Sequence, residues 1–224
     1  MRSILKQIKN EWRSNLFLFV ELLLVFAVLW YIVDMTTVTA RVYNAPMGFD
    51  TDHCYNISLG KLTPKAAAYI PDVTVTEDIE HLLQLTERLR HHSGVEAVAI
   101  SHNCFPYNDG SNSMRIVVDT TIINARQYSI SPDFFRVFRY TAADGTASDK
   151  MEEAIRNNQL VISSNLTEEY PELGMKDATS LQGSEVTLWN KDSDQRSRVG
   201  AIGTPLRWSH FYTTHEWGGA YIAE

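Results

Sequence analysis

The sequence is poor in cysteine, glycine and proline, and it lacks the motifs that mark several classes of enzyme. Only 2 of its 224 residues are cysteine, 11 are glycine and 7 are proline, which excludes disulfide-dense and collagen-like chains. The formal net charge is −7 and basic residues do not cluster beyond the first fifteen positions, so no nucleic-acid partner is expected, because phosphate binding needs grouped lysine and arginine. The patterns GxxxxGK[ST], GxGxxG, GxSxG and HExxH are also missing. No enzyme activity, cofactor or metal is therefore predicted.

One long apolar run stands out against this background. Residues 16–33, LFLFVELLLVFAVLWYIV, contain one charge and neither glycine nor proline. As a helix these residues measure about 27 Å, close to the hydrocarbon thickness of a bilayer. Trp12 before the run and Trp30-Tyr31 near its end are placed where aromatic side chains favour the membrane interface. The pattern predicts a transmembrane helix over residues 14–36, with the lipid bilayer as its surroundings.

The charges on the two sides of this run are unequal. Residues 1–15 contain four basic residues and one acidic residue, whereas 16 basic and 25 acidic residues follow from Asp34 onward. Basic flanks stay in the cytoplasm, so the predicted orientation is N-terminus inside and the following chain outside. A signal peptide cleaved after Ala40 is one alternative, disfavoured by the length of the run and by Glu21 within it. A helix buried in a soluble core is another, disfavoured by the one-sided basic flank.

Two features near the run predict further contacts. In residues 1–13 the apolar and the basic side chains fall on separate faces of a helix, which predicts an amphipathic helix lying on the inner leaflet. The alternative for this segment is a topology signal without an ordered helix. Glu21 is an acid inside the predicted span, where a charge is costly, and it is expected to face a partner helix in the membrane. The alternative is that it reaches towards the headgroups at the nearby cytoplasmic end.

Residues 37–224 are predicted to fold as one mixed α+β domain outside the membrane. A helix capped by Thr76 is expected between strands at 54–59 and 95–100, as a β-α-β unit. Acidic neighbours such as Glu152-Glu153 are interpreted as solvated turns and helix starts, as are 168–169 and Asp192 with Asp194. Further elements are expected as two strands within 114–131, a short helix at 132–138, a strand at 160–162, a short helix at 164–170 and strands at 184–189 and 198–202.

Cys54 and Cys104 both lie on the predicted exported side, where disulfides persist. A bridge between them would close a loop of about 50 residues and contribute about 4 kcal/mol. The pair is therefore a disulfide candidate. Free buried thiols are the alternative, and a metal cluster shared with His53 and His102 is a weaker one because the CxxC spacing is missing.

Several segments, taken in order, resemble one family. They are GVEAVAIS at 94–101, YSISPDFFRVFRYTAADG at 128–145, NNQLVISSNLTEEY at 157–170, LQGSEVTLWN at 181–190 and SRVGAIGTP at 197–205. Together with the basic N-terminal segment and the single span ahead of them, they resemble the periplasmic core domain of MacB/FtsX-type ABC transporter permeases. None of these segments is a catalytic signature.

The resemblance implies a permease subunit of the inner membrane. Its outer domain would contact a periplasmic adaptor protein or a substrate and would move when a separate cytoplasmic ABC ATPase subunit closes. It also implies a homodimer or pairing with another permease. The family has further spans after this domain, so the chain is expected to be an N-terminal portion of such a subunit. A single-span receptor or anchor whose outer domain binds a ligand or partner is the alternative.

Overall fold

The computed structural model describes residues 12–71, 73–102, 104–108, 112–175, 177–205, 207, 209–211 and 218–223. The chain divides into two units, Met1–Pro46 and Met47–Glu224, and each is described by itself. The amphipathic helix predicted over 1–13 lies almost wholly outside the described residues, so it stays a prediction.

The first unit contains helix α2, Trp12–Asn44. Its described side chains are exposed almost throughout, and it is long and apolar enough to cross a membrane. The helix continues beyond residue 36, the predicted end of the span, to Asn44, and its polar side chains there bond to their own backbone. The Thr36 and Thr37 hydroxyls each donate to the carbonyl four residues earlier at 2.7 Å. The division between the two units falls after Pro46, and the predicted end of the membrane span at residue 36 stays a prediction.

The second unit is a mixed α+β domain, as predicted. Its longer helices are α3 (Val75–Arg90) and α5 (Asp149–Arg156), with the one-turn helix α4 (Phe134–Val137) between them. Its strands are β1 (Ser101–His102), β2 (Asn112–Val118), β3 (Thr121–Ile130), β4 (Leu160–Ser163), β5 (Glu185–Leu188), β6 (Arg196–Gly203) and β7 (Gly219–Ala223). Short 3₁₀ helices are η1 (Ser164–Thr167), η2 (Pro171–Leu173) and η3 (Ala178–Leu181).

The strands form one sheet that closes on itself. Their order is β1-β3-β2-β5-β6-β4-β7, and β7 also pairs with β3, so six strands complete a ring and β1 adds to β3. The β2–β3 hairpin turns through Asp119, whose positive φ of 53° suits a two-residue turn. β7 runs parallel to β3 and antiparallel to β4. Closure satisfies the backbone groups that an open sheet would leave at its edges.

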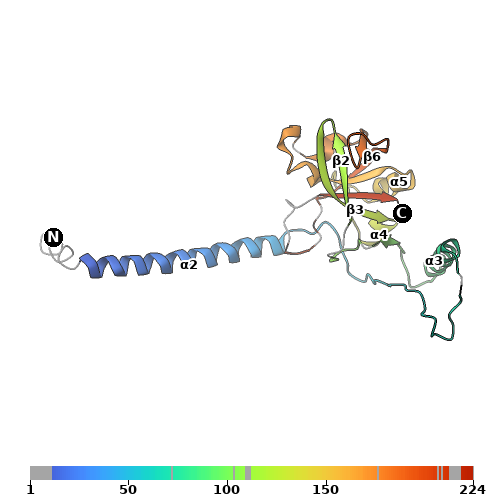
Figure 1. The fold of residues 1–224 in the computed structure, drawn as a ribbon, viewed down its shortest axis with the longest axis horizontal. Coiled ribbons are helices and arrows are strands. Elements are labelled where there is room, and N and C mark those ends of the chain that lie inside the picture. The colour runs from blue at the N-terminus through green and yellow to red at the C-terminus, as the bar shows by residue number, and fades with distance from the viewer. Residues whose placement is uncertain are drawn as a thin grey trace. The chain divides into compact units, whose positions relative to one another are not determined.

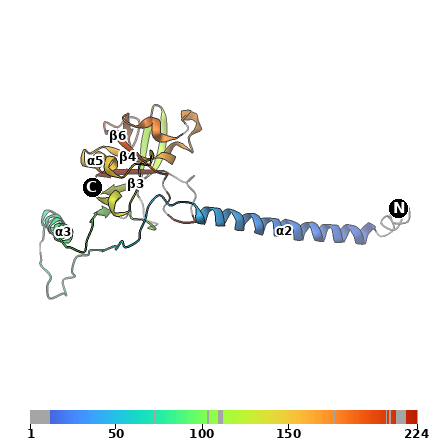
Figure 2. The ribbon, with the colours of Figure 1, turned by 180° about the vertical axis from the view of Figure 1, so that it is seen from behind.

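Both faces of the sheet are covered, which explains why β4 is buried at every position. Leu160 and Ile162 point into one apolar cluster, whereas Val161 between them points into the other. The first cluster is closed by residues of η1 and η3. The second is rich in aromatic residues and is closed by α4 and α5. Helix α5 contacts both β4 and β6; Figure 1 shows it beside β6, and Figure 2 shows it beside β4.

The β-α-β unit predicted around α3 does not form. Residues 54–59 have no regular secondary structure, and 55–59 lie exposed. Residues 95–100 are not a strand either, although Ile100 and Ser131 exchange hydrogen bonds just before β1. Apolar and polar residues do alternate here, but a strand needs a partner, and none of the described strands pairs with residues 54–59.

Two local errors have clear causes. Helix α3 is capped by Thr74, not by Thr76, because the Thr74 hydroxyl accepts from the Glu77 N–H while the Glu77 carboxylate accepts from the Thr74 N–H. The capping-box spacing was the missed signal. Helix α5 was also missed, although Met151, Ala154 and Ile155 have the spacing of one buried helical face.

Candidate functional site

In the second unit, Glu152 on α5 is a buried acid that contacts two arginines. It was interpreted as a solvated acid, and this is wrong, because its side chain is only 2% exposed. The Arg136 guanidinium donates to one carboxylate oxygen at 2.6 Å, and Arg156 reaches the same oxygen at 3.2 Å. The Ser148 hydroxyl donates to the other oxygen at 2.8 Å. Glu152 is buried because these three donors, two of them charged, replace its water.

Asp133 connects these side chains on α4 and α5 to a third helix, α3. Its carboxylate accepts from Arg90, the last residue of α3, at 2.8 Å, and lies 3.2 Å from Arg136. Arg156 lies 3.7 Å from the same carboxylate. The ends of α3, α4 and α5 are thereby joined by five charged side chains, which we call the charged cluster. Arg136 and Arg156 remain about half exposed, whereas the Glu152 side chain is almost fully buried and Asp133 is 18% exposed.

The charged cluster holds Glu152 in its ionised form. Burial alone raises the pKa of Glu152, but hydrogen bonds from Arg136 and Ser148 and the charge of Arg136 outweigh it, so the pKa lies below that of an ordinary glutamate. The same contact raises the pKa of Arg136. A carboxylate that stays ionised at neutral pH does not exchange protons there, so the cluster is suited to holding helices in place.

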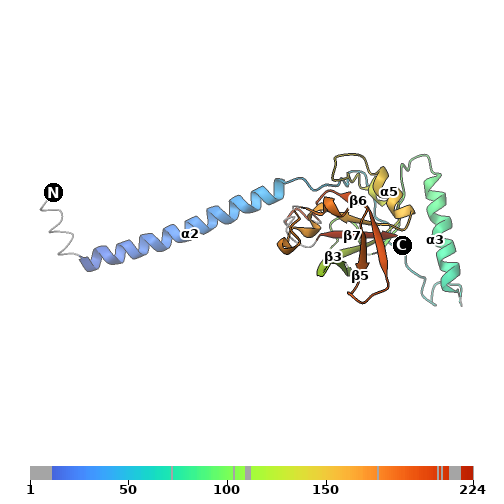
Figure 3. The same cartoon turned by 90° about the horizontal axis from the view of Figure 1, so that it is seen from above.

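Helix α3 belongs to a long excursion from the ring, residues 54–71 and 73–90, which we call the arm (Figures 1 and 3). Both of its ends are held near α4. At one end the Cys54 thiol donates to the Val137 carbonyl at 3.2 Å, and at the other Arg90 pairs with Asp133. Lys61 pairs with Asp78 within the arm. The arm is thus attached at its base and carries its own internal ion pair.

The arm leaves much of its apolar surface in water. Thr86 is the buried residue of α3, and the arm has eight large apolar side chains that are more than half exposed. These are Tyr55, Ile57, Leu59, Leu62, Ile70, Val75, Ile79 and Leu83. Exposed apolar residues gathered in one segment mark an interaction surface, whereas scattered ones need no explanation.

Cys54 and Cys104 are not joined by a disulfide in the structure. Cys54 is partly exposed, and burial raises the pKa of its thiol. Cys104 is buried beside the aromatic cluster, with its thiol 3.2 Å from the Ser129 carbonyl. Among the described residues no three histidine, cysteine or acidic side chains gather as metal ligands. The predicted disulfide therefore needs a direct test.

Thiol titration without reductant provides that test. We expect two thiols to react after denaturation. In the native chain we expect Cys54 to react slowly, because its raised pKa keeps the thiolate fraction small, and Cys104 to be protected. The measurement is the time course of a colorimetric thiol reagent. If no thiol reacted after denaturation, the cysteines would be bridged and the arrangement seen here would be wrong.

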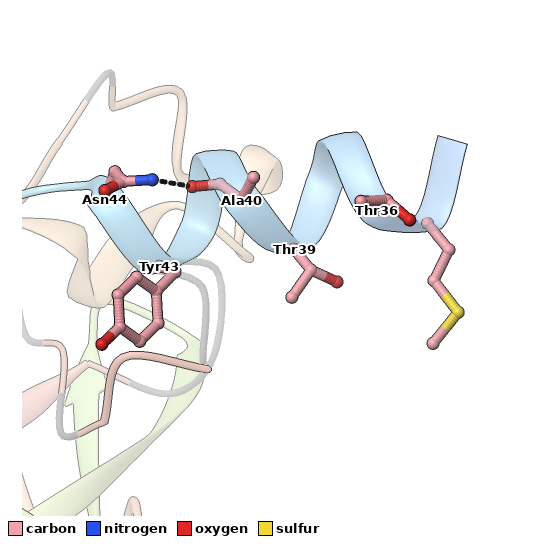
Figure 4. A pocket seen from close by; sticks show the side chains of 6 residues that line it. Thr36, Thr39, Ala40, Tyr43 and Asn44 are labelled. Carbon is pink, nitrogen blue, oxygen red and sulfur yellow. Dashed lines mark hydrogen bonds between the residues drawn. The ribbon is translucent and has the colours of Figure 1, made fainter. Parts of the chain in front are cut away.

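The end of helix α2 offers no enclosed site. A pocket there is lined by six residues of this one helix, among them Thr39 and Tyr43 on the same side one turn apart (Figure 4). The Asn44 amide donates to the Ala40 carbonyl at 2.7 Å and closes the last turn. Glu21, toward the N-terminal end of α2, is exposed. Its contact with a partner helix stays a prediction.

Comparison with known proteins gives similarity to solved structures alone. No protein-family model matches the chain, and no curated protein matches it. The extracellular domain of the noncanonic ABC-type transporter YknZ from Gram-positive bacteria is 15% identical with a TM-score of 0.40, over 62% of this chain and 60% of that one. The periplasmic region of MacB from Actinobacillus actinomycetemcomitans is 16% identical with a TM-score of 0.36, over 63% of this chain and 54% of that one.

A third structure, a domain of a proposed permease protein from Porphyromonas gingivalis, is 17% identical with a TM-score of 0.39, over 61% of this chain and 54% of that one. The alignments thus span between 54% and 60% of these three chains. Because the identities and TM-scores are low, the likeness does not by itself establish a shared function.

Proposed function

We propose that the chain is the N-terminal part of an ABC transporter permease subunit, anchored in the inner membrane with its second unit outside. The observation that carries this proposal is helix α2, which has an apolar run of membrane-spanning length and exposed side chains. Only Ala45 and Pro46 separate it from the second unit. The sequence segments that resemble MacB/FtsX-type permeases favour a transporter subunit over another kind of membrane-anchored protein.

In this proposal the second unit contacts a periplasmic adaptor protein or the substrate, and a separate cytoplasmic ABC ATPase subunit drives its motion. Two subunits pair, either as copies of this chain or with another permease. The charged cluster fits such a role because it ties α3 to α4 and α5, so that the base of the arm moves with the ring. The exposed apolar side chains of the arm supply a surface for a partner.

Purification of the tagged full chain from its native membranes in mild detergent tests the proposal. We expect ATP hydrolysis to purify with the chain, because the chain lacks a phosphate-binding loop of its own and needs an ATPase subunit. A variant of that subunit without its phosphate-binding lysine should remove the activity. A chain that purifies from membranes without any ATPase would favour the single-span receptor or anchor.

Reporter fusions test the orientation separately. We expect alkaline phosphatase fused after Ala223 to be active and green fluorescent protein at the same place to be dark, because the predicted location is an oxidising compartment. Replacing Arg2, Lys6, Lys9 and Arg13 by glutamate should raise the fluorescent fraction, since these residues hold the N-terminus inside. A fluorescent wild-type fusion would place the second unit in the cytoplasm and contradict the predicted topology.

A further inference from the structure

We propose that two copies of the chain pair through residues 55–59 of the arm, which form an antiparallel strand pair across a two-fold axis at Ile57. This inference rests on the proposed function because it assumes that two subunits pair. It adds the surface through which they pair. The partner that binds the exposed residues 55–59 is the same segment of a second copy of the chain.

The first support is the state of the backbone. Residues 55–59 are exposed, and no other described residue forms a hydrogen bond with their backbone N–H and C=O groups. The segment nevertheless has the alternation of a strand, with Tyr55, Ile57 and Leu59 separated by Asn56 and Ser58. An unpaired strand with this pattern is a template for pairing with another chain.

The second support is the symmetry of the pattern. Antiparallel pairing about Ile57 sets Tyr55 opposite Leu59 and Asn56 opposite Ser58, while Ile57 faces its own copy. Every pair then joins like with like, apolar with apolar and polar with polar. The segment has no charged residue, so two copies of an acidic chain meet here without opposing charges of one sign. A two-fold interface uses the same patch on both subunits, as this pairing does.

The third support is the amount of apolar surface. Further apolar side chains of the arm, at Leu62, Ile70, Val75, Ile79 and Leu83, are also more than half exposed. One side of an interface of standard size buries about 800 Å², and these exposed side chains can supply apolar surface to it. Two subunits anchored in one membrane share an orientation, so a two-fold axis along the membrane normal relates them and permits antiparallel strands.

Cysteine cross-linking distinguishes this register from any other contact. In the full chain in membranes, with Cys54→Ser as background and Cys104 left buried, Ile57→Cys should form a disulfide-linked dimer under mild oxidation, because opposite Cβ atoms lie about 5 Å apart. Leu59→Cys is the matched control, since its own copy lies about 13 Å along the strand. We expect at least about tenfold more dimer at position 57 than at 59.

Tyr55→Cys and Leu59→Cys chains should form a disulfide-linked dimer when they are mixed, because these positions face each other in the proposed register. Neither variant should form this dimer by itself. Equal cross-linking at 57 and 59, or none at 57, would overturn the pairing. ATP hydrolysis that still purified with such a chain would leave the proposed function standing, so the two failures are distinguishable.

The mass of the purified full chain in detergent gives a second readout. Ile57→Lys should convert the dimer to monomer, because two ammonium groups then face each other across the axis, and Ile57 is exposed in the single chain so its replacement leaves the fold intact. Ile122→Lys, at another exposed isoleucine on β3, should leave the dimer unchanged. A dimer that survives Ile57→Lys would show that pairing runs through another surface and would refute the proposal.

Discussion

Replacing Phe135 with alanine is expected to lower the free energy of unfolding by about 3–5 kcal/mol, the cost of removing a large aromatic side chain from a filled core. Phe135 is fully buried, and its ring packs edge-on against Tyr140 and Tyr221, with ring centres 5.9 and 5.1 Å away. These contacts join α4 to β7, two elements far apart in the sequence. The cavity left by alanine therefore weakens the closure of the ring as well as the packing of α4.

Chemical denaturation of the full chain in detergent, followed by tryptophan fluorescence, measures this loss. Phe211→Ala is the matched control, because that ring is 71% exposed and its removal should change the stability by less than about 0.5 kcal/mol. Similar losses at both positions would show that the aromatic cluster is not packed as described.

Glu152→Ala is expected to cost about 2–3 kcal/mol, less than the full penalty for breaking a buried ion pair. The variant removes the common partner of Arg136 and Arg156, but both guanidinium groups are about half exposed and water screens their charge. Glu153→Ala is the control. Glu153 neighbours Glu152 in the sequence but is exposed, so its replacement should have little effect on denaturation. Equal effects would mean that the charged cluster does not hold α5.

The contribution of Glu152 should depend on pH in one direction. Its pKa is lower in the folded chain than in the unfolded chain, so its stabilising effect is complete above the ordinary carboxyl pKa of about 4.3 and disappears as the pH falls through the folded value. Glu152→Gln imitates the protonated side chain. The stability difference between wild type and Glu152→Gln should thus narrow in acid, and a constant difference from pH 7 into that range would contradict the lowered pKa.

Much of the ring could be predicted because its signals are local. The β2–β3 hairpin overlaps the predicted range 114–131 and begins two residues before it, and β4, β5, β6 and α4 fall where apolar runs and turn residues placed them. Each of these elements is defined by neighbours within a few residues. The apolar run of α2 is a signal of the same kind, since length and composition alone decide it.

The candidate site could not be predicted in the same way. From the sequence, Glu152 is expected to be a surface acid, because the residues around it do not indicate that Arg136, sixteen positions earlier, donates to it. Nor does the sequence show that α3 ends against Asp133. Charged side chains become buried only when distant donors replace their water, and that depends on how α4 and α5 pack.

The sequence by itself determined that this chain has one run of membrane-spanning length, an uneven charge distribution around it, and a mixed α+β unit after it. These depend on composition and on periodicity. Only the tertiary structure decided that β7 closes the ring between β3 and β4, that Glu152 is buried, and that residues 54–59 remain unpaired. The reason is that strand pairing and charge burial each need a partner distant in the sequence, and a pattern along the chain shows what a segment favours but not whether that partner is there.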